Sequence, residues 1–255
     1  SSYRWGVASI VLIVFGWLSG CNFRLAGKDW GVVFLLSLLR AVTSFSLIIA
    51  YQNIASGVAS TIHFMYPLAV ALAMMFFFRE KKSLLVILAV LMSLLGAALL
   101  SLGELEAKSG NTMVGLVAAC VSVFSYAGYI VGVRTTRAVQ INSTALTCYV
   151  MGLGTIFYLI GAYCTSGLQL VSDGYTWLII LGLALPATAI SNITLVQAIK
   201  YAGPTLTSIL GAMEPLTAVV IGVFVFKELF TVNSAVGIIL ILLAVSIVVF
   251  RRQKS

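Results

Sequence analysis

The sequence has 255 residues, of which 61% are hydrophobic and 9% are charged. Soluble domains are typically about one quarter charged, so this composition excludes a protein that covers its whole surface with polar groups and indicates one that lies in a lipid bilayer. The net charge of +8 comes from basic residues scattered between apolar segments, and it does not indicate a nucleic-acid partner because no basic patch or nucleic-acid-binding motif accompanies it.

Apolar segments of about 20 residues, each bounded by polar or turn residues, are typical of transmembrane helices. Short connections join them, and no soluble domain or linker interrupts the pattern. We therefore predict an all-α, multi-pass integral membrane protein. In chain order the predicted spans are 3–21, 31–50, 56–78, 83–102, 112–133, 143–165, 175–198, 203–226 and 233–250.

The distribution of basic residues predicts the orientation of these spans. With the C-terminus in the cytoplasm, 11 of the 15 Lys and Arg residues lie on the cytoplasmic side, three lie on the opposite side, and Arg40 lies within a span. Cytoplasmic loops carry such an excess of basic residues. Because the loops are short and the one glycosylation motif, at Asn142, falls on the cytoplasmic side, we expect a cell inner membrane of bacterial type.

The span 31–50 carries a charge near its middle. A charged side chain at the bilayer centre costs about 2.5–3.5 kcal/mol on insertion scales, so Arg40 must face protein or a wet cavity. Ser37, Thr43 and Ser44 lie three or four residues away on the same helical face. Two interpretations are equally favoured: contact with an anionic or carboxylate substrate, or a structural bond to Glu214 or to a backbone carbonyl.

The span 56–78 holds the single histidine of the chain. His63 shares a face with Ser60 and Tyr66, and Pro67 follows them. An imidazole exchanges protons near neutral pH, so this face favours a substrate or proton site over a structural hydrogen bond between helices. Later spans repeat the pattern with Tyr126 in 112–133 and Asn192 in 175–198, and both side chains are as consistent with helix packing as with substrate contact.

The span 203–226 places a carboxylate at membrane depth. Glu214 shares a face with Thr207, Gly211 and Thr217, and Pro215 follows it. The carboxylate fits either a proton-coupling or cation-binding role or a helix-packing role, and packing is slightly favoured.

The chain contains an internal repeat. Residues 50–80 align without gaps to residues 198–228, with identities that include Met65/Met213, Pro67/Pro215 and Glu80/Glu228. The third and eighth spans carry the two copies. Because the eighth span comes five spans after the third, which is an odd step, the copies cross the membrane in opposite directions, as in many alternating-access transporters.

The repeat also predicts where the site lies. His63 aligns with Gly211, and Tyr66 aligns with Glu214. Each proline removes a backbone donor and frees the carbonyl one turn earlier, at His63 and at Gly211. We expect the two proline helices to meet and to form the two walls of a substrate site.

The sequence resembles the EamA-type transporters of the drug/metabolite transporter superfamily. The resemblance rests on the two Pro-to-Glu helix ends, on the Glu214–Pro215 pair, and on residues 1–12, which resemble the arginine-bearing second helix of that family. It implies a ten-helix architecture of two inverted five-helix halves, 1–102 and 103–255, with the first helix missing here. Transporters that this chain resembles move amino acids, nucleotide sugars, choline-like cations and other small metabolites.

We therefore predict a secondary active transporter of a small polar metabolite, such as an amino acid or another carboxylate, that works by alternating access with proton coupling or exchange. The expected site residues are His63, Tyr66, Arg40, Glu214, Ser60, Gly211, Tyr126 and Asn192. The alternative is a membrane-embedded enzyme that uses the buried His, Arg and Glu on a lipid-linked substrate. No phosphate-binding loop, metal motif or nucleophile elbow is present, so we expect no ATPase activity, no cofactor and no metal. We expect the protein to be a monomer or homodimer in the bilayer, with a small-molecule substrate as its partner and protons as a candidate second partner.

Overall fold

Helices make up the regular structure of all described residues, as the sequence predicts. The computed structural model describes residues 2–18, 20–79, 84–101, 110–165, 174–211, 213–224 and 232–253. The α-helices are α1 (Ser2–Leu18), α2 (Trp30–Asn53), α3 (Ser56–His63), α4 (Tyr66–Phe77), α5 (Leu84–Ser101), α6 (Thr112–Thr135), α7 (Ser143–Thr165), α8 (Gly174–Ala184), α9 (Ser191–Ala202), α10 (Pro204–Leu210), α11 (Met213–Phe224) and α12 (Val232–Gln253), with a 3₁₀ turn η2 (Arg137–Gln140) and a π-helical turn η3 (Leu185–Ile190).

Each predicted span coincides with described helix. Within the described residues, five helical segments are long and apolar enough to cross a membrane, at Trp30–Asn53, Val58–Phe77, Thr112–Thr135, Ser143–Gly161 and Gly174–Ala202, and three shorter apolar helices lie within α1, α5 and α12. Glu80 and Glu228, the acidic ends of the predicted repeat, lie outside the described residues.

The chain divides into two compact units. Unit 1 comprises Ser1–Ala41 and Gly132–Ala202, and unit 2 comprises Val42–Val131 and Gly203–Ser255. Each unit takes residues from both predicted halves of the sequence. The units are defined by spatial contacts and the halves by sequence similarity, so the boundary at residue 102 stays a prediction.

Unit 1 is organised around the packing of α1 on α7. The indole of Trp5 is buried, lies directly over Gly154, and meets the ring of Tyr158 edge to face with centroids 5.1 Å apart. The Ser9 hydroxyl donates to the carbonyl of Cys148 at 3.4 Å. Small residues on α7 therefore let α1 approach closely, as is common between membrane helices.

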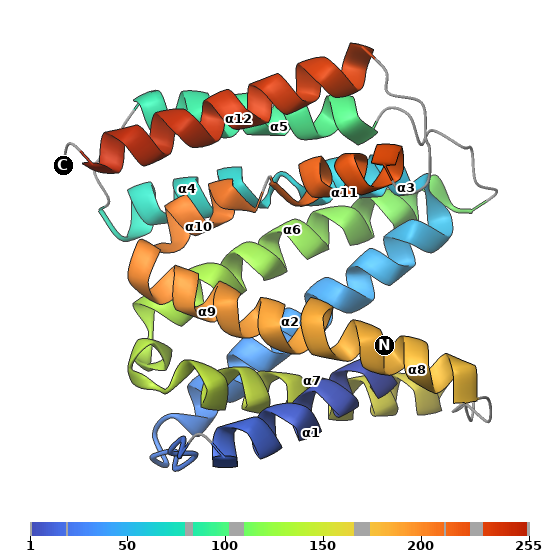
Figure 1. The fold of residues 1–255 in the computed structure, drawn as a ribbon, viewed down its shortest axis with the longest axis vertical. Helices are drawn as coiled ribbons and strands as arrows, with labels where there is room; N and C mark the ends of the chain where they lie inside the picture. The colour runs from blue at the N-terminus through green and yellow to red at the C-terminus, as the bar shows by residue number, and fades with distance from the viewer. Residues whose placement is uncertain are drawn as a thin grey trace. The chain divides into compact units, whose positions relative to one another are not determined.

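Unit 2 is organised around two helix pairs, α5 with α12 and α4 with α10, which Figure 1 shows side by side. A Cβ atom at Gly96 of α5 would lie 2.7 Å from the carbonyl of Gly237 on α12, so this crossing requires glycine. A buried apolar cluster joins the two pairs; its fully or almost fully buried members are Ala71, Met75, Ala89, Val90, Ile209 and Ala244. The spans that the repeat aligns therefore pack against each other inside unit 2.

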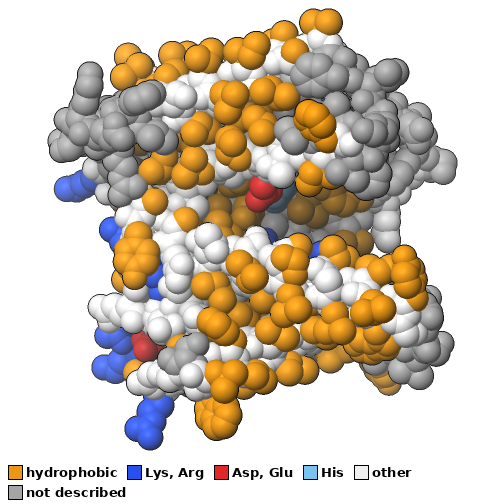
Figure 2. Space-filling model, viewed as in Figure 1, with side chains coloured by type: hydrophobic (Ala, Val, Ile, Leu, Met, Phe, Trp, Pro, Cys, Tyr) orange, Lys and Arg blue, Asp and Glu red, His pale blue; other side chains and the backbone are white. Residues whose placement is uncertain are grey.

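Hydrophobic side chains cover much of the visible surface, including the face of α12, as Figure 2 shows. Leu85, Leu88 and Leu91 of α5 and Leu242 and Leu243 of α12 are among the exposed ones. This outward apolar surface is what a protein needs when lipid is its solvent.

Candidate functional site

The third predicted span is broken at its centre. α3 ends at His63 and α4 begins at Tyr66, with Pro67 in the first turn of α4. A proline cannot continue a helix through its own position without losing a hydrogen bond, but it is favoured in a first turn. The Met65 N–H turns back to the Ile62 carbonyl at 3.0 Å, which closes the end of α3.

The eighth predicted span is broken at the equivalent place. α10 ends at Leu210 and α11 begins at Met213. The Gly211 carbonyl, which Pro215 is expected to free, accepts a hydrogen bond from the Glu214 N–H at 3.0 Å. The helix restarts rather than kinks, so the turn itself satisfies that carbonyl.

Three aromatic rings meet at the first break. The ring of His63 stacks on Tyr126 of α6 with centroids 5.4 Å apart and planes 27° apart, and it lies 5.5 Å from the ring of Tyr66. Tyr66 and Tyr126 meet edge to face at 4.7 Å. Such contacts each contribute about 0.5–1.5 kcal/mol beyond burial, so the three rings hold one another in place.

A hydrogen bond to Ser122 orients the imidazole. The Nδ1 atom of His63 lies 3.0 Å from the Oγ of Ser122, and that hydroxyl donates its single proton to the Ala119 carbonyl at 2.6 Å. The imidazole and the Ala119 carbonyl thus both lie within hydrogen-bond distance of the Ser122 hydroxyl. A neutral imidazole has one N–H donor and one acceptor nitrogen, and it can also take up a proton.

A serine–threonine contact fixes α6 against α2 close to this cluster. The Thr43 and Ser125 hydroxyls lie 2.9 Å apart, and Ser125 donates to the Val121 carbonyl at 2.8 Å. Ser125 therefore accepts from Thr43. Both side chains are buried, and a satisfied polar pair of this kind holds two membrane helices in register.

The two broken helices touch at Tyr66 and Gly211. Tyr66 is 2% exposed, and its hydroxyl occupies the space that a side chain at position 211 would fill. The larger residue of one repeat copy thus fits against the glycine of the other. This contact agrees with the prediction that the two proline helices meet, although no particular pair of residues was predicted.

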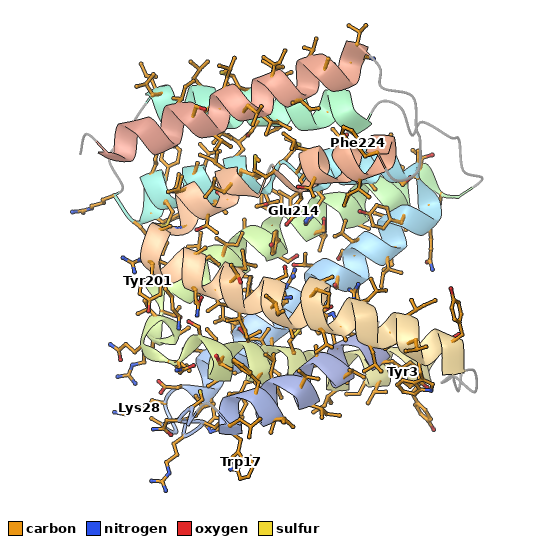
Figure 3. The ribbon with its side chains drawn as sticks, in the orientation of Figure 1. Tyr3, Trp17, Lys28, Tyr201, Glu214 and Phe224 are labelled. Atoms are coloured by element: carbon orange, nitrogen blue, oxygen red, sulfur yellow. The ribbon has the colours of Figure 1, made fainter. Side chains whose placement is uncertain are left out.

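Glu214 lies at the start of α11, where Figure 3 labels it. Its side chain is exposed, as is Thr217, whereas Thr207 of α10 is buried. The sequence predicts that these residues share one polar face, but the break leaves Thr207 on α10 and places Glu214 and Thr217 on α11. Ser60, another expected site residue, contacts a different helix: its hydroxyl lies 3.2 Å from the hydroxyl of Tyr51 on α2.

A second polar group lies in unit 1. Arg40 donates from Nη2 to the Oδ1 of Asn192 at 3.1 Å, and the Nδ2 of Asn192 donates to the Thr188 carbonyl at 2.7 Å. Thr188 belongs to the π turn η3, which contains Pro186, and its hydroxyl donates to the Leu183 carbonyl at 3.1 Å. π turns within membrane helices often mark functional positions.

The structure thus gathers the predicted residues into two groups. Unit 2 brings together His63, Tyr66, Tyr126 and Gly211, and unit 1 brings together Arg40 and Asn192. Ser122, which orients the imidazole, is not among the expected site residues. No sequence signal pairs it with His63, because 59 residues separate them.

Polar and aromatic groups at breaks in apolar helices define a class: an all-helical membrane transporter, in which interrupted helices supply the groups that contact substrate. The sequence matches the EamA-like transporter family over residues 1–102 and 113–250. The chain belongs to this family, which is part of the drug/metabolite transporter superfamily.

Two further similarities agree with this membership. An uncharacterized transporter of Archaeoglobus fulgidus is 28% identical over 238 residues, which are 92% of this chain and 83% of the relative. A protein of known crystal structure superimposes with a TM-score of 0.83 at 18% identity, covering 100% of this chain and 88% of that one. The structural match shows a shared fold.

Proposed function

We propose that this transporter moves a small polar metabolite bearing a carboxylate across the cell inner membrane by alternating access, with proton coupling or exchange. The observation that carries the proposal is the His63–Tyr66–Tyr126 cluster at the break between α3 and α4. The cluster offers two aromatic surfaces and an imidazole that can hydrogen-bond to a substrate or hold a proton. The orientation proposed from basic residues places the C-terminus in the cytoplasm.

Arg40 supports the choice of a carboxylate. The Asn192 oxygen accepts from its Nη2 and so orients the guanidinium. A guanidinium has five N–H donors in a fork that matches a carboxylate, and an amino acid or organic acid carries such a group.

The test is uptake into proteoliposomes of a panel of radiolabelled amino acids, organic acids, nucleotide sugars and quaternary amines. We expect accumulation of at least one carboxylate-bearing solute, and we expect His63→Gln to lower its initial uptake rate by about tenfold, the loss typical when one proton-transfer or charge-assisted contact of about 1.4 kcal/mol is removed.

The matched control is Thr194→Val. Thr194 is an exposed polar residue of α9 whose hydroxyl donates to the carbonyl of Ile190, the last residue of η3, at 2.9 Å. Its replacement should leave uptake unchanged. Uptake of quaternary amines without any carboxylate would refute the substrate class, and equal uptake by His63→Gln and wild type would refute the site.

A further inference from the structure

A polar cavity lies in unit 1 where three helices end at the membrane surface. Its volume is about 300 Å³, which is at the small end of the range for ligand sites. It forms where η2 leads into the N-terminus of α7 and where α9 ends, so its position is the level of the lipid headgroups. Gln140, Asn142, Gln197, Lys200 and Tyr201 supply most of its polar lining.

A buried lysine forms part of the cavity wall. Lys200 is 9% exposed, and its Nζ donates to the Ile141 carbonyl. That carbonyl is neutral and takes one of three N–H donors. No carboxylate is among the residues that line the cavity, all of which belong to the described part of the chain. A buried ammonium without a counter-charge is costly, so the cavity is suited to an anion.

Neighbouring groups increase the positive potential. Arg134 donates from Nη1 to the Lys200 carbonyl at 2.6 Å, which brings a guanidinium to the end of α9. The Asn142 side chain accepts from the Thr144 N–H at 2.9 Å and so caps the N-terminus of α7, the positive end of its helix dipole. Asp29 and Glu214, the two acidic residues within the described part of the chain, do not line the cavity.

The outer side of the cavity has the character of a membrane interface. Tyr201 is 81% exposed beside Lys200, and exposed tyrosines at helix ends anchor membrane proteins at the headgroup level. Figure 3 labels Tyr201 and Lys28 along the same edge of unit 1, and Figure 2 shows Lys and Arg side chains gathered there. Basic pockets between transmembrane helices bind anionic headgroups in this way.

From these observations we infer that the cavity at Lys200 is a binding site for the phosphate group of an anionic phospholipid, separate from the proposed substrate site. The ammonium of Lys200 pairs with the phosphate oxygens, the Gln140 and Gln197 amides donate to the headgroup, and Tyr201 lies at the lipid interface. The occupied site fixes the α6–α7 connection to the end of α9.

The experiment is thermal unfolding of the purified full chain in detergent, titrated separately with short-chain phosphatidylglycerol, short-chain phosphatidylcholine and inorganic phosphate. We expect phosphatidylglycerol to raise Tm at lower concentration than phosphatidylcholine, because both carry the phosphate but only the first has net negative charge. Inorganic phosphate at the same concentrations should leave Tm unchanged. A rise with inorganic phosphate equal to that with phosphatidylglycerol would overturn the lipid assignment in favour of a soluble anion.

Three variants locate the effect. Lys200→Gln should weaken the apparent affinity for phosphatidylglycerol about fivefold, which corresponds to the contribution of one basic residue near the membrane surface. Gln197→Glu keeps Lys200 but places a negative charge in the cavity wall, so it should weaken binding similarly. This variant tests the site if Lys200→Gln does not fold.

The control is Arg137→Gln, which removes one positive charge from an exposed position of η2 outside the cavity lining. It should keep wild-type affinity. Wild-type affinity in both cavity variants would overturn the proposal, as would equal losses in all three.

Discussion

At the scale of single residues, the contact between Tyr66 and Gly211 joins the two broken helices. The Tyr66 hydroxyl fills the space over Gly211, so a side chain added at position 211 would clash with the tyrosine. Protein interiors are packed so closely that even one added methyl group must displace a neighbour. The fit at this point therefore sets how α4 and α10 approach each other.

Gly211→Ala should destabilise the protein by about 1–3 kcal/mol, the usual cost of overpacking. Its Cβ would meet the Tyr66 hydroxyl, and the Tyr66 ring also contacts Tyr126. Thermal unfolding in detergent measures the effect. Gly182→Ala in α8 is the matched control, because a Cβ there meets no atom within 4 Å.

A double variant separates this clash from other effects at position 211. Tyr66→Phe removes the hydroxyl that the new methyl group meets, so Gly211→Ala combined with Tyr66→Phe should recover more than half of the lost stability. Additive losses in the double variant would show that the backbone at 211, rather than the Tyr66 contact, requires glycine.

At the scale of helices, the sequence predicts most of what the structure shows, for a simple physical reason. Backbone groups in lipid must be satisfied within each helix, so a long apolar segment has few alternatives to a helix. His63, Tyr66 and Tyr126 were predicted as site residues because a polar side chain at membrane depth is costly unless it has a partner or a function. The structure brings the three side chains of α3, α4 and α6 into contact.

Other features depend on contacts that no spacing reveals. Arg40 could be satisfied by Glu214, a carbonyl or a substrate, and the partner in the structure, Asn192, lies 152 residues away. The π turn at Pro186 adds a residue to its helix turn, which changes the face that Asn192 presents. The sequence predicts one span over 56–78 and does not predict the break at Phe64 and Met65, because a proline in an apolar segment is compatible with either a kinked helix or a restarted one.

The crossing of α5 and α12 gives a prediction at this scale. Gly96→Ala should lower Tm measurably, because the new Cβ would meet both the Gly237 carbonyl and the Ile241 side chain at 2.7 Å. Alanine is otherwise the better helix former by about 0.5–1 kcal/mol. A rise in Tm would therefore show that α5 and α12 can move apart without loss of stability. The expected loss is about 1–3 kcal/mol by thermal unfolding.

At the scale of the whole molecule, the predicted inverted repeat suggests how a transporter of this family would work. Two copies of one sequence pattern that cross the membrane in opposite directions can exchange conformations, and the exchange moves access to a site from one side to the other. The aligned spans pack as pairs within unit 2, α5 with α12 and α4 with α10. The pairs differ at the break, where His63 aligns with Gly211 and Tyr66 with Glu214, so the two conformations need not be equally stable.

Alternating access predicts counterflow. Proteoliposomes loaded with unlabelled substrate and diluted into a trace of labelled substrate should accumulate the label transiently above its external concentration, because each carrier that delivers an unlabelled molecule outward returns with a labelled one. A channel open to both sides carries the two pools independently and gives no overshoot. His63→Gln should slow the rise of the label about tenfold, in line with its lower initial uptake rate, whereas Thr194→Val should keep the wild-type time course. Equilibration without an overshoot in the wild-type protein would exclude alternating access while leaving the helical fold and the family membership as they stand.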